Sequence, residues 1–206
     1  MIIVIGREFG SGGRQIGRMV AERLGIAYYD KELLSEAAGR LGFSPEVFAA
    51  TDEKRPSPFR SLVQGLYGIA DNFHTTSMSG ERLYEQQSAV IRDLAERGPC
   101  VIVGRTADYI MRDNPCMVSV FLHAPIEWRA EKIVRRGDCM VLEKAKDVAR
   151  GVDRDRENYY NYFTGQGWGR ANNYHLTIDA SKLPASKIAD IIVDYATEVC
   201  RRKEGR

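Results

Sequence analysis

Residues 2–15 read IIVIGREFGSGGRQ, and this stretch decides the fold. Its first four residues are apolar and β-branched, which is typical of a short strand buried on both faces. Gly6 follows the run, and Gly10, Gly12 and Gly13 then place three glycines within four residues. Beyond them, apolar residues recur at helical spacing up to residue 24. A strand, a glycine-rich turn and a helix in this order predict the first unit of an α/β fold.

The rest of the chain continues this alternation of apolar runs and helical spacings. The predicted strands cover residues 2–5, 26–29, 100–103, 117–122 and 174–178. The predicted helices cover residues 13–24, 81–97, 126–136 and 142–162, and a last helix follows Pro184. Strands that alternate with helices predict an α/β protein with a parallel sheet of about five strands and helices on both faces.

Two stretches interrupt the alternation and predict insertions. Residues 35–80 carry no strand signal and contain several prolines, so we expect short helices there. Residues 135–141 connect two predicted helices and predict a mobile hairpin. We therefore expect one domain over residues 1–206, with its core at residues 1–34 and 81–206. Insertions at the carboxyl ends of parallel strands are where such folds grip their ligands.

The composition argues against several classes of protein. The 206 residues include 30 basic and 28 acidic ones, a net charge of +2, which argues against a nucleic-acid partner. No apolar run approaches the roughly 20 residues of a membrane span, and the first residues lack the features of a signal peptide. The four cysteines and three histidines are scattered, so we expect reduced thiols and no metal site built from these residues. We expect a cytoplasmic globular protein with no membrane partner, whose oligomeric state the sequence does not reveal.

The glycine-rich turn suits a phosphate group. Glycines let the backbone curl so that successive N–H groups converge, and the helix that follows adds the positive end of its dipole. The dinucleotide fingerprint GxGxxG fits Gly10 and Gly12 and finds Asp30 about 20 residues further on, but Gln15 stands where its last glycine belongs. A glycine turn that merely joins a strand to a helix is a further interpretation.

The P-loop motif GxxxxGK[ST] also fits this turn in part, through Gly12. Arg7 stands at its first glycine position, Gly13 at its lysine position and Arg14 at its hydroxyl position. Arg14 is one place beyond the usual lysine, so we expect its guanidinium to reach a β- or γ-phosphate.

Further motifs follow the turn in order. They are Tyr28-Tyr29-Asp30-Lys31-Glu32, Val101-Ile102-Val103-Gly104-Arg105, Val120-Phe121-Leu122-His123-Ala124-Pro125, residues 153–160, and Asn173-Tyr174. With these motifs in order, nearly the whole chain resembles the cytidylate kinases, and more closely the cytidylate kinase-like branch of the nucleoside monophosphate kinases. The resemblance implies a P-loop NTPase-type fold with an acceptor-binding helical insertion at residues 35–80. It also implies ATP and Mg²⁺ as cofactors and phosphoryl transfer to a nucleoside monophosphate, such as CMP or dCMP.

The resemblance implies roles for individual residues as well. The donor triphosphate would lie on Gly10, Ser11, Gly12, Gly13, Arg14 and Gln15. The catalytic residues would be Arg14, Arg105, Asp153 and Arg156. The acceptor-binding residues would be Asp30, Arg105 and Asp153, and the lid would carry Arg135 and Arg136. Asp155 competes with Asp153 for its role, because the register is ambiguous by two residues.

Each of these side chains also has a purely structural interpretation. Arg105 could pair with a carboxylate at the end of a strand, and Asp30 could cap the helix that follows it. Residues 153–156 could form an exposed helix face with weak ion pairs, and Arg135 and Arg136 could be surface residues at a helix end. The aromatic side chains near the end of the same helix are interpreted as packing residues; they are Tyr159, Tyr160, Tyr162, Phe163 and Trp168.

Because Gly13 stands where the P-loop motif carries lysine, three functions remain open. The chain departs from better-known cytidylate kinases in lacking the loop lysine, and neither Arg14 nor Gln15 offers a hydroxyl for Mg²⁺, so Ser11 or water would serve as the metal ligand. The first function is a cytidylate kinase-like nucleoside monophosphate kinase. The second is a P-loop kinase for a non-nucleotide small molecule, and the third is a nucleotide-binding sensor that no longer transfers phosphate.

Overall fold

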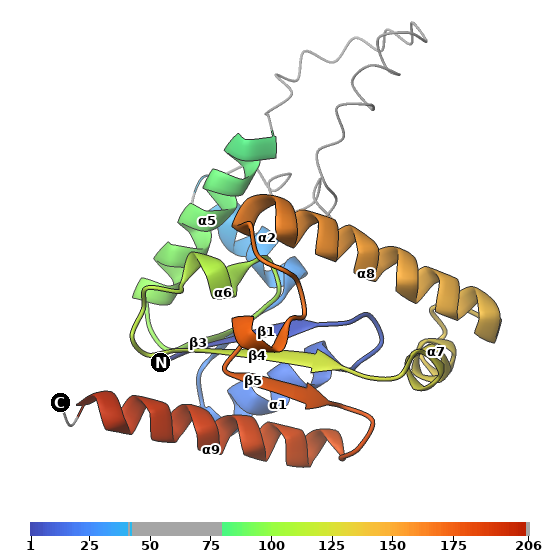
Figure 1. Cartoon of the computed structure of the whole chain (residues 1–206). Helices are drawn as coiled ribbons and strands as arrows, with labels where there is room; N and C mark the ends of the chain where they lie inside the picture. Colours follow the sequence, from blue (N-terminus) through green and yellow to red (C-terminus); the bar gives the residue numbers. More distant parts are fainter. Residues whose placement is uncertain (41, 43–79, 205–206) are drawn as a thin grey trace, which may run out of the picture.

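Five parallel strands form the sheet at the centre of the molecule (Figure 1). The structure, a computed structural model, describes residues 1–40, 42 and 80–204. The strands are β1 (Ile2–Arg7), β2 (Ala27–Tyr29), β3 (Cys100–Val103), β4 (Met117–His123) and β5 (Leu176–Asp179). They lie in the order β2-β3-β1-β4-β5, and every neighbouring pair is parallel. The expected α/β fold with a parallel sheet is therefore confirmed.

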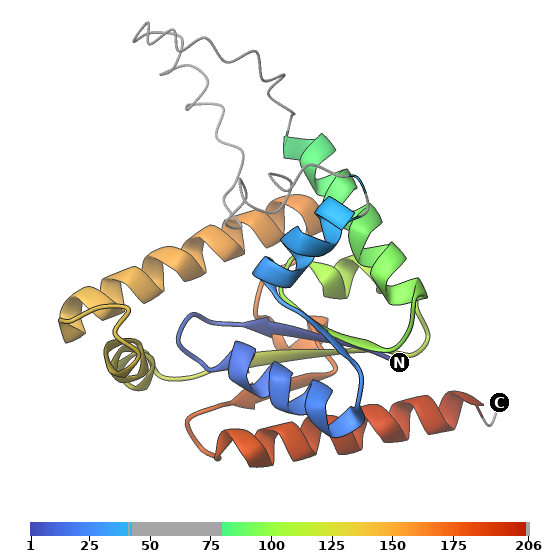
Figure 2. The ribbon, with the colours of Figure 1, turned by 180° about the vertical axis from the view of Figure 1, so that it is seen from behind.

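Helices cover both faces of this sheet, as expected. They are α1 (Gly13–Leu24), α2 (Lys31–Arg40), α5 (Gly80–Glu96), α6 (Ala107–Ile110), α7 (Ile126–Arg135), α8 (Leu142–Thr164) and α9 (Ala185–Glu204), with a 3-10 turn at Ala171–Asn173. Helices α1 and α9 lie on one face, and α2, α5 and α6 lie on the other (Figures 1 and 2). Helix α8 crosses the molecule on the side of α2 and α5, and α7 lies beyond the end of β4.

The central strand, β1, divides its side chains between two apolar cores. Ile2 and Val4 belong to the core that faces α2, α5 and α6, whereas Ile3 and Ile5 belong to the core that faces α1 and α9. All four side chains are at most 2% exposed. Because both faces of the strand are buried, its apolar run is continuous rather than alternating with polar residues. The strand has β3 on one side and β4 on the other, so its carboxyl end lies in the middle of the sheet edge.

Several elements differ from the sequence predictions. Strand β1 continues two residues further than expected, through Arg7, and helix α8 ends two residues later, at Thr164. Strand β5 begins two residues later than expected, because the N–H of Tyr174 closes the 3-10 turn at Ala171–Asn173 by donating to the carbonyl oxygen of Ala171 at 3.3 Å. Helices α2 and α6 were not predicted as separate elements. The predicted insertion at residues 35–80 lies outside the described residues, except for residues 35–40, 42 and 80.

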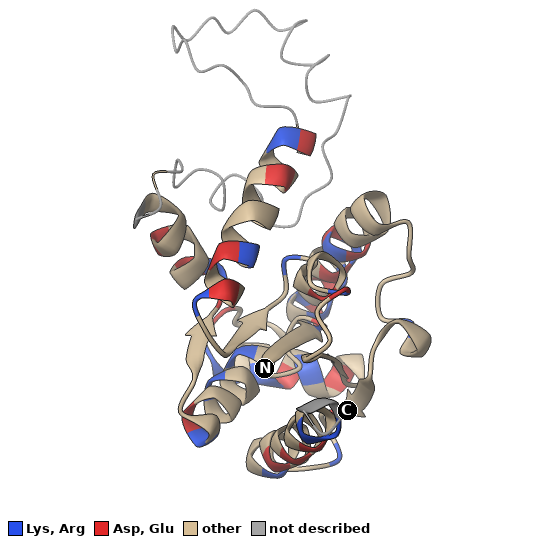
Figure 3. Ribbon diagram, turned by 90° about the vertical axis from the view of Figure 1, so that its left-hand side faces the viewer, with Lys and Arg blue, Asp and Glu red and all other residues tan. Residues whose placement is uncertain are grey.

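The surface carries charges of both signs. Basic and acidic residues alternate along α5, for example (Figure 3). The four cysteines form no disulfide bonds. In the part of the chain that the structure describes, no helix is both long and apolar enough to cross a membrane.

Candidate functional site

A cleft of about 500 Å³ opens at the carboxyl end of β1. Its lining combines the glycine-rich turn, the first turn of α1, the end of α7 and one residue of α8. The lining residues are Arg7, Glu8, Phe9, Gly10, Gly12, Gly13, Arg14, Gln15, Lys132, Arg135, Arg136, Asp138 and Arg156. Six of these side chains are basic and two are acidic, so the cleft is strongly cationic although the whole chain is nearly neutral. Such a concentration of positive charge attracts a polyanion.

The glycines of the turn adopt conformations that other residues avoid. Gly10 has φ +84° and Gly12 has φ +95°. A Cβ on Gly10 would also lie 3.0 Å from the carbonyl oxygen of Arg129. Gly12 precedes the first residue of α1, so the free N–H groups of that helix begin at the cleft. This arrangement suits a phosphate group.

Arg7 occupies the place that a lysine at position 13 would need. A Cβ on Gly13 would lie 2.9 Å from both Cβ and Cγ of Arg7. The missing loop lysine is therefore matched by an arginine that packs across the same position from the end of β1. Arg7 also lines the cleft, so positive charge is retained beside the turn.

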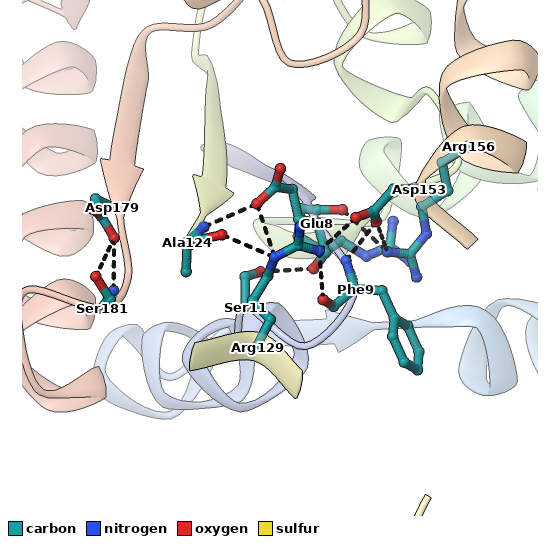
Figure 4. Close-up of polar contacts among 10 residues, drawn as sticks. Glu8, Phe9, Ser11, Ala124, Arg129, Asp153, Arg156, Asp179 and Ser181 are labelled. Atoms are coloured by element: carbon teal, nitrogen blue, oxygen red, sulfur yellow. Dashed lines mark hydrogen bonds and ion pairs between the residues drawn. The ribbon is translucent and has the colours of Figure 1, made fainter. Parts of the chain in front are cut away.

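Arg129 of α7 binds the backbone of the glycine-rich turn and links it to neighbouring segments (Figure 4). Its guanidinium donates to the carbonyl oxygens of Ala124 and Phe9 at 2.9 and 3.0 Å, and it binds the carboxylate of Asp153. Its Nε lies 3.3 Å from Oε2 of Glu8. The Arg129 side chain is 8% exposed. A buried arginine with all these partners fixes the position of the turn relative to α7 and α8.

Two partly buried carboxylates complete this network. Asp153 accepts a hydrogen bond from the backbone N–H of Phe9 at 2.7 Å, and Glu8 accepts one from the N–H of Ala124 at 2.9 Å. Burial raises the pKa of both carboxyl groups, although Arg129 and the N–H donors oppose the shift. The sequence left Asp153 and Asp155 as alternatives for one role. Of the two, Asp153 is the residue whose carboxylate contacts the glycine-rich turn.

Ser11 and the other loop residues take different places. The Ser11 side chain is fully buried, and its hydroxyl donates to the carbonyl oxygen of Glu8 at 2.8 Å. This bond closes the turn on itself. Gln15 and Arg14 are exposed and line the cleft. The guanidinium of Arg14 lies 3.2 Å from the carboxylate of Glu32 on α2, with both side chains more than half exposed.

A second, much smaller pocket surrounds Arg105, next to the cleft. Its lining residues are Gly6, Arg7, Gly104, Arg105, Thr106, Asp108, Arg156, Tyr159, Tyr160, Trp168 and Tyr174. Arg7 and Arg156 line both pockets. Arg105 is only 2% exposed. The carboxyl end of β3 therefore carries a buried arginine toward the same end of the sheet as the turn.

The backbone beside Arg105 is strained. Arg105 has φ +62° and Thr106 has φ +51°, and both follow Gly104 at φ +80°. A β-branched residue such as Thr106 rarely adopts this left-handed conformation. Strain of this kind clusters at functional sites, where the surrounding structure holds it in place.

Asp30 lies outside both pockets. Its carboxylate is 2% exposed and accepts a hydrogen bond from the N–H of Leu33 at 3.3 Å, which caps α2. Its other oxygen lies 3.4 Å from Nη2 of Arg18 and 3.3 Å from the hydroxyl of Tyr28. The structural interpretation of Asp30 as a helix cap therefore has direct support.

Helix α7 and the segment after it bring three cations to the cleft. Arg135 and Arg136 were expected there; Arg136 lies 2.6 Å from the carboxylate of Asp138. Lys132 was not expected. Together with Arg129, it is a functional candidate that sequence reasoning missed. The available signal was helical spacing. Arg129 lies one helical turn before the buried Ile133, and Lys132 lies one helical turn after Trp128.

The aromatic side chains near the end of α8 pack on one another, as interpreted from the sequence. Phe163 stacks on Tyr84 of α5 with 4.3 Å between ring centroids, and Tyr159 lies 4.7 Å from Phe163. Trp168 contacts Phe121 edge to face at 5.1 Å. These contacts join α8 and the segment after it to α5 and the sheet.

The site residues fit a nucleotide polyphosphate better than they fit a metal ion held by the protein alone. The turn provides N–H groups at a helix start, and six basic side chains surround it. Among residues 1–40, 42 and 80–204, no three His, Cys, Asp or Glu side chains gather as a metal site. Mg²⁺ usually keeps several waters and binds through substrate phosphates, so such a site is compatible with it.

The sheet order, the glycine turn and the helices on both faces define the fold of the P-loop kinases. A gluconokinase from Sinorhizobium meliloti is 16% identical with a TM-score of 0.54, covering 98% of this chain and 94% of that one. A shikimate kinase from Acinetobacter baumannii is 17% identical with a TM-score of 0.51, covering 96% and 92%. At these identities the likeness concerns the fold alone. An uncharacterized protein from Eubacterium ventriosum is 27% identical with a TM-score of 0.71, covering 96% and 98%.

Residues 2–182 match the model of the cytidylate kinase-like family, and the chain therefore belongs to this family. It is 25% identical over 183 residues to the cytidylate kinase of Pyrococcus horikoshii, which covers 88% of this chain and 81% of that protein. It is 24% identical over 196 residues to the cytidylate kinase of Pyrobaculum aerophilum, which covers 95% and 92%. The resemblance stated from the sequence motifs is confirmed.

Proposed function

We propose that this protein transfers the γ-phosphoryl group of ATP to a nucleoside monophosphate, with CMP or dCMP as the acceptor. One observation carries the proposal. Two pockets adjoin at the end of β1: a cationic cleft over the glycine turn and a smaller pocket around Arg105, with Arg7 and Arg156 lining both. A kinase needs a donor site and an acceptor site in contact, with positive charge between them.

The chemistry requires no general base. The attacking oxygen of a monophosphate is already ionised near neutral pH, so catalysis consists mainly of alignment and charge neutralisation. ATP would supply the γ-phosphoryl group, and Mg²⁺ would neutralise charge on its oxygens. This explains how a site of backbone N–H groups and arginines could suffice.

The side chains divide this work by position. The N–H groups of the turn and the first turn of α1 would bind the donor triphosphate, with Arg14, Arg135 and Arg136 at the rim of the cleft. Arg105 would bind the acceptor phosphate. Arg7 and Arg156 would lie beside the transferring group.

Asp153 would act as a positioning residue. Its carboxylate binds the N–H of Phe9 and the guanidinium of Arg129, and it lies 3.7 Å from Nη1 of Arg156. These contacts would hold the turn and aim Arg156. A direct contact of Asp153 with the acceptor is therefore not part of the proposal.

Turnover of a panel of nucleoside monophosphates with ATP and Mg²⁺ tests the function. We expect ADP to form with CMP and dCMP faster than with AMP, GMP or UMP. No transfer to a monophosphate, a sugar or another small alcohol, with ATP binding intact by calorimetry, would favour a nucleotide-binding sensor and refute the kinase. Transfer to a sugar or other small alcohol only would refute the nucleotide acceptor.

Two variants on one helix sharpen the test. Arg156→Met should lower kcat by about 100-fold to 1,000-fold, the usual loss when one preorganised donor is removed. Arg154→Met is the matched control, because Arg154 is exposed on the same helix and does not line either pocket. Equal kcat values in the two variants, at equal unfolding midpoints, would contradict the role of Arg156.

A further inference from the structure

Lys132 places its ammonium group directly over the glycine turn. A Cβ built on Gly12 would lie 3.3 Å from Nζ of Lys132, and Lys132 lines the cleft. Gly12 is the residue immediately before α1. The ammonium therefore lies where a phosphate held by the start of α1 would meet it.

The same turn excludes a lysine of its own. The Cβ and Cγ atoms of Arg7 lie 2.9 Å from the place of a Cβ on Gly13, the position at which the P-loop motif carries lysine. A side chain could enter position 13 only if Arg7 moved. The cleft thus has a blocked lysine position in the loop and an ammonium beside the neighbouring residue.

The surroundings of Lys132 hold the side chain in place and leave its charge available. Nζ lies 4.2 Å from the centroid of the Trp128 ring, one helical turn earlier. Within the described residues, its ammonium has no carboxylate partner. Burial, followed by the charges of Arg135 and Arg136, lowers the pKa of Lys132 from its ordinary value. The negative charge of a bound anion would offset these effects, because it stabilises the charged form of the ammonium group.

Arg14 is the competing candidate for the same task. Its side chain is 52% exposed, and its guanidinium lies 3.2 Å from the carboxylate of Glu32. The negative charge of Glu32 already compensates this guanidinium in part. Lys132 has no such carboxylate beside it in the described part of the chain, which favours it over Arg14.

We propose that Lys132, supplied by α7, takes the place of the missing loop lysine and binds the β- or γ-phosphate of the donor nucleotide. The proposal rests on the proposed function, because it assumes that the cleft binds a nucleoside triphosphate. It makes donor binding depend on α7, the helix that precedes the predicted lid. Arg129 of the same helix binds the carbonyl oxygen of Phe9, so the position of Lys132 relative to the turn is fixed.

Calorimetric titration of Lys132→Met with ATP, and separately with inorganic tripolyphosphate, tests the proposal without any acceptor. We expect the Kd of both ligands to rise at least tenfold relative to the wild type. Lys132→Arg should retain most of the affinity, because it keeps the charge. Lys144→Met is the matched control, because Lys144 is an exposed lysine of α8 that does not line the cleft.

The outcomes separate this proposal from the function of the enzyme. An unchanged Kd in Lys132→Met would overturn the proposal even if the wild type phosphorylates CMP. A tenfold rise that occurs in Arg14→Met but not in Lys132→Met would assign the task to Arg14 instead. A tenfold rise in Lys132→Met would support the proposal even if no monophosphate is phosphorylated. Should Lys132→Met lower the unfolding midpoint, Lys132→Gln replaces it, and the same criteria apply.

Discussion

Arg129 illustrates how one side chain can support a site without touching its ligand. Its guanidinium joins Glu8, Phe9 and Asp153, three residues of two separate segments, and it is nearly fully buried. Buried charges are stable only when they are paired and hydrogen-bonded. Removal of this arginine would take the cationic partner from Glu8 and one of two cationic partners from Asp153.

We therefore expect Arg129→Met to lower the free energy of unfolding by about 3–5 kcal/mol, the usual cost of breaking a buried ion pair from one side. The control is Arg97→Met, which removes an arginine that is 59% exposed, follows the last residue of α5 and pairs with Asp93 of that helix. It should change stability by less than about 1 kcal/mol, as exposed pairs do. Urea denaturation of both variants checks this, and similar losses in the two would contradict it.

Glu8 and Asp153 predict a dependence of stability on pH. Burial raises the pKa of both carboxyl groups in the folded chain. At pH values between the ordinary pKa of Asp, 3.8, and the raised one, the folded chain holds a proton that the unfolded chain has lost. The free energy of unfolding therefore falls as the pH rises through this interval.

Asp153→Asn removes one of these titrations. The stability of the wild type relative to Asp153→Asn should decrease as the pH rises above 3.8, the ordinary pKa of Asp. The measurement is urea denaturation of both proteins at several pH values. A difference that stays constant or grows with pH would show that Arg129 outweighs burial in setting the pKa of Asp153.

At the scale of elements, the turn between β1 and α1 depends on close contact with α7. Gly10 has φ +84°, and a Cβ there would lie 3.0 Å from the carbonyl oxygen of Arg129. Gly25, at the other end of α1, has φ +63° and open space around it. Both glycines have a positive φ that is unfavourable for any other residue, but only Gly10 has atoms close to the place of a Cβ.

Gly25→Ala should cost about 1–2 kcal/mol, the penalty of the left-handed conformation alone. Gly10→Ala should cost more, because the contact with Arg129 adds to the same penalty, and it should also weaken ATP binding. Denaturation and calorimetry on both variants measure these effects. Equal losses of stability, with equal affinity for ATP, would show that the turn and α7 can separate without consequence.

The sequence predicted those elements whose signals are local. The limits of β3 and α1 agree with the prediction, because a continuous apolar run and a glycine stop define them. Helix α6 has only four residues, too few for a periodic pattern. Strand β5 begins later than predicted, because Tyr174 closes a 3-10 turn that has no apolar pattern to reveal it.

The residues of the candidate site were predictable from the sequence only where they lie in or beside a recognisable motif. The glycine turn, Arg14, Arg135 and Arg136 line the cleft, and Arg105 lines the smaller pocket beside it. Arg129 and Lys132 were missed, since a basic residue on a helix resembles a surface residue until the packing of that helix is known. Asp30 shows the opposite case, a residue that was expected in the site but lines neither pocket. Its carboxylate caps α2 instead.

At the scale of the whole molecule, the two pockets meet on the central strand. Gly6 lines the smaller pocket, Arg7 lines both, and the residues from Glu8 onward line the cleft. The strand is held on both sides by β3 and β4 and is buried on both faces. The spacing between the two pockets is thus set by consecutive peptide units within the most constrained part of the sheet.

The position of β1 has a consequence for how the molecule tolerates change. We expect substitutions in the outer helices to alter which side chains line the two pockets. The pockets themselves should stay equally far apart, because Gly6 and Arg7 are consecutive residues of one strand that is bonded on both sides.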